Sequence, residues 1–125
     1  MRYMLSIYID PTAETGAEMS EWWALNEALE KAGAFRAGDA LEHPSTATTV
    51  RLRGGERLLT DGPFAETKEQ LGGFYIVEAK DLDEALSWAE RVPSLKHHGA
   101  VEVRPIVEFP DAPAANGAAA EQAAS

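Results

Sequence analysis

The turn at residues 60–64 has the strongest potential for chemistry in this chain. Asp61 precedes Gly62-Pro63, a pair that forces a sharp turn at the end of a strand, and Phe64 follows. A carboxylate held beside an aromatic ring can lose part of its hydration, which raises its pKa and suits it to general acid or base catalysis. The alternative is that Asp61 caps the segment after the turn, as aspartate in such turns commonly does.

Two further side chains could act together with Asp61. His43 could shuttle a proton near neutral pH and would form an acid–base pair with Asp61 if the fold joins them; otherwise it is an exposed loop residue. Lys68 lies in a Glu-Thr-Lys-Glu run that predicts one or two helical turns. It could bind an anionic ligand or keep Asp61 ionised, or it could belong to a solvated face with weak ion pairs.

Arginine and tryptophan side chains supply further candidates. Arg104 lies on a predicted strand and would recognise a carboxylate or phosphate if it points into a cleft, whereas an outward orientation would pair it with an acid. Trp22 and Trp23 are adjacent and therefore cannot share one helix face. We expect Trp22 in the core and Trp23 at the edge of a cleft or of a subunit interface.

The sequence gives no indication of a metal or cofactor. His97-His98 is the only histidine pair, and adjacent histidines in a loop seldom bind the same ion. The chain contains no phosphate-binding loop, dinucleotide fingerprint, nucleophile elbow or zinc motif. We therefore expect no cofactor.

Composition restricts the class of protein. The 125 residues carry a formal charge of −10, from 21 acidic and 11 basic side chains, which disfavours direct binding to nucleic acid or to anionic lipid. No apolar run approaches the roughly 18 residues of a membrane span. Cysteine is absent and the first residues lack the pattern of a secretory signal, so we expect a cytoplasmic protein.

Hydrophobic periodicity predicts the elements that position these residues. Strands are expected at 3–9, 35–41, 48–53, 56–60, 73–79 and 101–109, with a Gly54-Gly55 hairpin turn between the third and fourth. One helix follows a capping-box spacing at Thr15 and Glu18 and ends at Gly33. A second helix begins at Asp81 and stops before Pro93.

This order is the split βαβ pattern of ferredoxin-like α+β folds, with an additional hairpin in the middle. Both helices should cover one face of an antiparallel sheet. The uncovered face would contain Tyr8, Tyr75 and Val77, or their neighbours if the alternation has the opposite phase, and these side chains are not typical of solvent-exposed surfaces. We therefore expect a homodimer that packs face to face. Residues 1–109 form the predicted domain, and 110–125 form a flexible tail rich in Ala and Pro.

The sequence also resembles a known family. Residues 60–74 read TDGPFAETKEQLGGF, which resembles the signature of the YCII-related, DGPF-type proteins. Four other stretches agree with that family: 2–5, 38–41, 47–51 and 101–105. The resemblance covers about residues 1–109.

The resemblance implies a dimeric α+β barrel of ferredoxin-like topology. It also implies a pocket in which relatives place a histidine–aspartate pair, and elimination-type chemistry on small ring compounds in some of them. Asp61 matches the aspartate of the DGPF signature. The early-helix region where relatives carry the histidine has Trp22-Trp23 here, so His43 is the remaining substitute. DGPF-type proteins are also associated with sigma factors of the extracytoplasmic-function group, which implies a possible protein partner and a regulatory role.

Two hypotheses follow from these observations. The first is a regulatory or accessory module that binds a small molecule in a cleft near the Asp-Gly-Pro-Phe turn. The second is a cofactor-free lyase-type enzyme in which Asp61 and His43 act on a small ring or anionic substrate. In either case the expected ligand-binding residues surround the turn and the open face of the sheet: Tyr8, Gly62, Pro63, Phe64, Lys68, Tyr75 and Arg104.

Overall fold

A computed structural model describes residues 1–13 and 16–110 of the chain. The elements in order are β1 (Arg2–Ile9), α1 (Met19–Lys31), β2 (Phe35–Ala40), the 3-10 helix η1 (Pro44–Thr46), β3 (Thr48–Arg53), β4 (Glu56–Asp61), β5 (Gln70–Glu78), α2 (Leu82–Ala89), the 3-10 helix η2 (Pro93–His97) and β6 (Ala100–Pro105). The last strand therefore ends four residues earlier than expected. Within the described residues no helix is long and apolar enough to cross a membrane. The tail expected after Pro110 lies outside this range.

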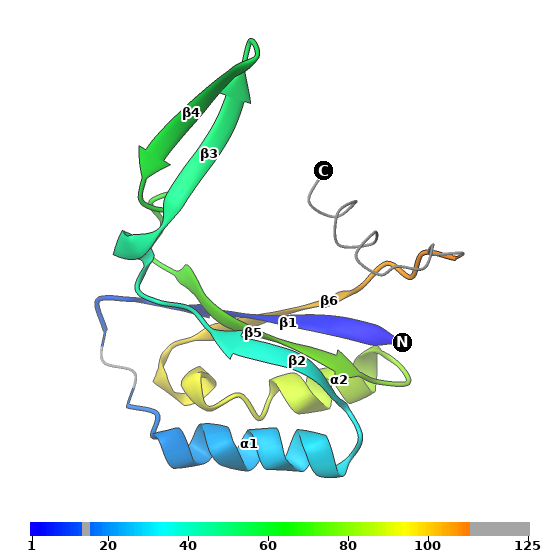
Figure 1. Ribbon diagram of the computed structural model, residues 1–125. Coiled ribbons are helices and arrows are strands. Elements are labelled where there is room, and N and C mark those ends of the chain that lie inside the picture. Colours follow the sequence, from blue (N-terminus) through cyan, green and yellow to red (C-terminus); the bar gives the residue numbers. More distant parts are fainter. Residues whose placement is uncertain (14–15, 111–125) are drawn as a thin grey trace.

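Four strands form one antiparallel sheet in the order β2-β5-β1-β6. Both helices lie against one face of this sheet, and the β3–β4 hairpin projects from the other side (Figure 1). This arrangement confirms the ferredoxin-like α+β fold that the order of elements predicts.

Local sequence signals explain where the two helices begin and end. Glu18 and Glu21 form a reciprocal capping box at the start of α1, in which each side chain accepts a backbone N–H of the other. Thr15, the expected partner of Glu18, lies outside the described residues. Gly33 follows the last turn with a φ of +69°, the left-handed conformation that ends many helices. At α2 the Asp81 carboxylate accepts the N–H of Glu84 at 2.9 Å, as expected.

The core lies between the helices and the sheet. Leu5 of β1, Val77 of β5 and Leu29 of α1 are almost completely buried there. Leu5 is paired with Tyr75 and so shares its face. Tyr75 and Val77 therefore face the helices.

The open face of the sheet carries the neighbours of Tyr75 and Val77, which is the second of the two phases left open for β5. Met4 pairs with Ile76 and Ser6 pairs with Phe74, and these side chains face away from the helices. The regular pairing of β1 with β5 is interrupted by a register shift between Ile7 and Tyr8.

The β3–β4 hairpin is a separate two-stranded sheet. Its turn is Gly54-Gly55, with φ values of +57° and +82°, as expected for a tight hairpin turn. The excursion that contains the hairpin is closed at its base by a hydrogen bond from the Leu41 N–H to the Gly72 carbonyl at 2.9 Å. The hairpin is thus an insertion between two strands that are neighbours in the main sheet.

Candidate functional site

The Asp-Gly-Pro-Phe turn is fixed to the base of the hairpin by backbone hydrogen bonds. Asp61 is the last residue of β4 and is paired with Thr48. Gly62 has a φ of +99°, donates its N–H to the Ala47 carbonyl at 2.7 Å and accepts the Thr49 hydroxyl at 2.9 Å. Glycine is favoured here because other residues rarely adopt this backbone conformation.

The segment after the turn is irregular, so the expected helical turns around Lys68 are wrong. The Gln70 side-chain amide donates to the carbonyls of Ala65 and Thr67, at 3.0 and 2.9 Å. The Thr67 hydroxyl donates to the Glu69 carbonyl at 2.6 Å. These side-chain bonds satisfy backbone carbonyls that a helix would have used, and β5 begins at Gln70.

The two candidate catalytic residues are both exposed. His43 caps η1, where its Nδ1 accepts the Ser45 N–H at 3.1 Å. No hydrogen bond joins His43 to Asp61, and none reaches the Asp61 carboxylate from residues 1–13 or 16–110. Catalysis by this pair stays a prediction.

The other expected ligand-binding residues do not gather around the turn. The Phe64 side chain is 78% exposed, and Gly62 and Pro63 are half-buried. Arg104 donates to the Glu102 carboxylate at 2.8 Å, the outward pairing that was one of its two alternatives, and this bond holds the pKa of Arg104 above its ordinary value. Tyr8 lies next to this pair, on a neighbouring strand.

Lys68 is exposed and lies near Asp10, at the end of β1. The pKa of Asp10 is lowered chiefly by hydrogen bonds from Thr12, and to a smaller extent by the positive charge of Lys68. The charge of Lys68 therefore acts on Asp10, and its proposed effect on Asp61 stays a prediction.

A cavity lies elsewhere, between α1 and the sheet. Its volume is about 490 Å³, which is within the usual range of small-molecule sites. Of the expected ligand-binding residues, only Tyr75 lines it. The lining comes from β1, α1, β2, β5 and η2: Ile7, Ile9, Met19, Trp22, Trp23, Asn26, Phe35, Gly38, Asp39, Ala40, Leu41, Gly72, Gly73, Phe74, Tyr75 and Ser94.

Two tryptophans of the first turns of α1 form one wall of this cavity. Trp22 packs against the core, and Trp23 is 65% exposed. Both agree with their expected places, since Trp23 was expected at the edge of a cleft. On the opposite wall, a β-carbon at Gly38 would come within 2.7 Å of the Tyr75 ring, so glycine there lets the ring lie flat along the edge strand.

The cavity has a small number of polar groups. The Tyr75 hydroxyl donates to Asn26 Oδ1 at 2.6 Å, which directs the Asn26 amino group away from Tyr75. Burial raises the pKa of Tyr75, so this hydroxyl keeps its proton at neutral pH. Ser94 of η2 is only 3% exposed, and its Oγ has no hydrogen-bond partner among the described residues.

Among residues 1–13 and 16–110, no charged side chain reaches the cavity from the helix-covered side of the sheet. Asp39 is the single charged residue among the described residues of the lining, and it is paired with Phe74. Tyr75 and Gly38, the adjacent pair, face the helices, so the alternation of the strands turns the Asp39 and Phe74 side chains to the open face. These two residues therefore border the cavity with their backbone.

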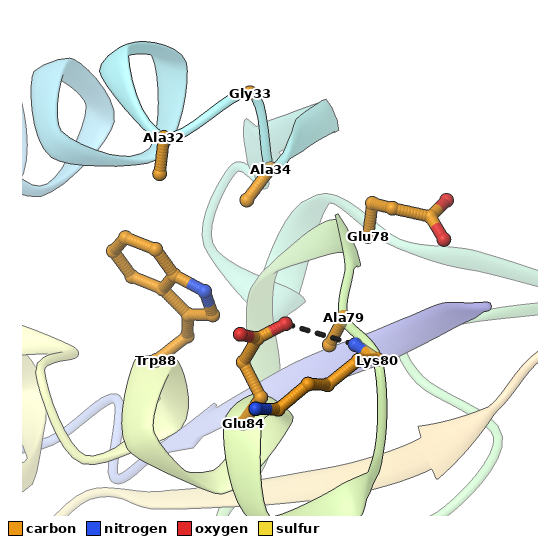
Figure 2. A pocket seen from close by; sticks show the side chains of 8 residues that line it. All are labelled: Ala32, Gly33, Ala34, Glu78, Ala79, Lys80, Glu84 and Trp88. Carbon is orange, nitrogen blue, oxygen red and sulfur yellow. Dashed lines mark hydrogen bonds between the residues drawn. The ribbon is translucent and has the colours of Figure 1, made fainter.

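A second hollow of about 310 Å³ lies between the end of α1 and the start of α2 (Figure 2). Trp88 and Glu84 face it, and the Glu84 carboxylate accepts the Lys80 N–H at 2.8 Å. Glu78 points away from it and pairs with Arg36 and with the chain's amino group. The carboxylates here already have partners. Among the described residues, no three His, Cys, Asp or Glu side chains are placed to hold a metal ion.

Asn26 and Ser94 are two lining residues that were not predicted from the sequence. A signal for Asn26 was present, because it is a polar residue beside Leu25 and three positions before Leu29, within the apolar stripe of α1. Ser94 follows Val92-Pro93, which was used only as a stop signal for α2. Because Asn26 and Ser94 lie far apart in the sequence, sequence patterns do not show that both line the same cavity.

The structure defines a small ferredoxin-like α+β domain with a cavity between α1 and its sheet. The YCII-related domain model matches residues 1–110, so the chain belongs to the YCII-related family. It is 39% identical over 92 residues to a protein of Rhizobium meliloti (strain 1021), named uncharacterized protein R00369. That match covers 73% of this chain and 74% of the relative.

Proposed function

We propose that this protein binds a small molecule in the cavity between α1 and the sheet. The observation that supports the proposal is a hollow of about 490 Å³ whose walls are largely apolar, with two tryptophans on one side and a few polar groups inside. Small-molecule sites typically have this composition, because apolar walls supply affinity and a few polar groups fix the orientation.

The cavity connects the proposed ligand to the Asp-Gly-Pro-Phe turn. Leu41 and Gly72, which hold the two ends of the inserted segment together, both line the cavity. A ligand that orders these two residues would also order the base of the hairpin and the turn beyond it. Such coupling is suited to a regulatory or accessory module, and the association with sigma factors stays a prediction from the family resemblance.

The homodimer is part of the same proposal, and the hairpin is its proposed contact surface. Val50, Leu52 and Leu59 lie on one face of the hairpin and are 59%, 74% and 56% exposed. A projecting ribbon with an exposed apolar face is suited to pairing with a second copy of the chain. We expect Leu52→Lys to convert a dimer into a monomer in analytical ultracentrifugation. Leu82→Lys, which changes an exposed leucine on α2, should leave the dimer intact.

The cavity proposal is tested by comparing two exposed aromatic residues. Trp23 lines the cavity, whereas Phe64 lies in the Asp-Gly-Pro-Phe turn and does not. Both side chains are exposed, so replacing either by alanine should cost little stability. Isothermal titration calorimetry with 2-naphthamide measures binding to each variant.

We expect Trp23→Ala to weaken binding about three- to tenfold, the loss typical of one aromatic stacking contact. Phe64→Ala should bind as the unchanged protein does. If Phe64→Ala loses affinity and Trp23→Ala does not, the ligand site lies at the turn and the proposed cavity is wrong.

A further inference from the structure

The chemistry of the cavity restricts what it can bind. The side chains that enter it from α1, η2 and the helix-covered side of the sheet are apolar or uncharged, and the Asp39 carboxylate lies on the other face of the sheet. An ion that enters such a site loses hydration and gains no opposite charge. Both carboxylates and ammonium groups should therefore bind poorly.

The Asn26 amide defines the polar group that would bind well. Its oxygen is occupied by the Tyr75 hydroxyl at 2.6 Å, so its amino group is the part that remains to donate hydrogen bonds. Tyr75 is buried and the Asn26–Tyr75 bond crosses from β5 to α1, which holds the amide in one orientation. The arrangement suits a ligand oxygen that accepts a hydrogen bond.

From these observations we infer that the cavity is selective for uncharged compounds that carry a carbonyl or hydroxyl oxygen, with Asn26 as the residue that determines this specificity. The inference rests on the proposed small-molecule function. The inferred selectivity means that an anionic substrate, which one hypothesis from the sequence assigns to the Asp61 turn, should not bind in this cavity.

A matched series of probes tests the inference, because the ring is constant and the polar group alone changes. The probes are 2-naphthamide, 2-naphthoate and 2-naphthylmethylammonium, titrated calorimetrically into the full chain at neutral pH. We expect the amide to bind at least tenfold more tightly than either ion. If the carboxylate or the ammonium probe binds as tightly as the amide, the inferred selectivity is wrong while the proposed binding function stands. If none of the probes binds, the proposed function itself fails.

The variant Asn26→Asp identifies the residue responsible. Aspartate has nearly the same shape and still accepts the Tyr75 hydroxyl, but it replaces the amino donor by a negative charge. We expect the variant to lose affinity for the amide probe. It should bind the ammonium probe at least tenfold more tightly than the amide probe. An unchanged order of affinities in a folded variant would exclude Asn26 as the selective residue.

Discussion

Replacing Ser94 by alanine should stabilise the ligand-free protein. The Ser94 side chain is in the wall between η2 and the cavity, 3% exposed, and its hydroxyl lacks a hydrogen-bond partner among the described residues. Folding therefore removes the hydroxyl from water without returning a hydrogen bond. Alanine avoids that loss and leaves the methylene group, and thus most of the packing, in place.

The expected size of the effect follows from the cost of an unpaired buried hydroxyl. That cost is about 1–3 kcal/mol, and the space left by one oxygen atom offsets part of the gain, so we expect a net stabilisation of about 1 kcal/mol. For a folded domain of about 100 residues, 1 kcal/mol corresponds to a rise in Tm of about 4–8 °C.

Urea denaturation and a thermal scan followed by circular dichroism measure this prediction. Ser87→Ala is the matched control, because the Ser87 hydroxyl is exposed and donates to the Glu84 carbonyl at 2.6 Å. The control should change the free energy of unfolding by no more than about 0.5 kcal/mol. If Ser94→Ala destabilises the protein by 1 kcal/mol or more, the Ser94 hydroxyl has a hydrogen-bond partner in solution, which would refute the reasoning that it is buried without one.

Three further predictions concern the scaffold. Leu29→Ala removes a side chain of 0% exposure between α1 and the sheet and should lower the free energy of unfolding by about 2–5 kcal/mol in urea; a loss below 1 kcal/mol would contradict the described core. Gly55→Val, at a φ of +82°, should speed amide hydrogen exchange in the hairpin without moving the urea midpoint of the main sheet, and a shifted midpoint would show that the hairpin and sheet unfold together. The pKa of Glu21 is lowered mainly by its hydrogen bond from Lys96. The carboxylate therefore stabilises the fold at pH values above 4.5, its ordinary pKa, and this contribution is lost as the pH falls through the lowered pKa. In a carboxyl ¹³C NMR titration, Lys96→Gln should raise that pKa while Lys31→Gln leaves it unchanged, and equal effects would refute the assignment.

Much of the fold could be predicted because strong local signals agree with each other. The capping carboxylate of Asp81, the positive φ of Gly33 and the Gly54-Gly55 turn each mark the end of an element, and the structure has all of them. Their order along the chain then leaves few ways to build an antiparallel sheet with two helices on one face.

The phase of β5 could not be predicted for a physical reason. The run Phe74-Tyr75-Ile76-Val77 is apolar on both faces, so alternation alone does not identify the buried side. Pairing with β1 decides it, since Leu5 is buried and lies opposite Tyr75.

The candidate site could be predicted less well than the fold. Asp61 was predicted as a site residue from a local turn and a family signature, whereas the cavity is made by residues from five separate elements. The places of Trp22 and Trp23 were predictable, because two adjacent tryptophans cannot both be buried by one helix face, and Tyr75 was expected among the ligand-binding residues. The Asn26–Tyr75 bond joins residues 49 positions apart, a contact that periodicity does not reveal.

The bond between Leu41 and Gly72 has a consequence for how this domain can be varied. Because the two residues are adjacent in space, residues 42–69 leave the main sheet close to the point at which the chain returns to it in β5, where Gln70 and Leu71 pair with β1. A short turn could replace residues 42–69, and the excised segment would take none of the buried core with it. The domain is therefore a scaffold with a natural graft point, at which evolution or an engineer can exchange the whole projecting segment and keep the cavity beneath it.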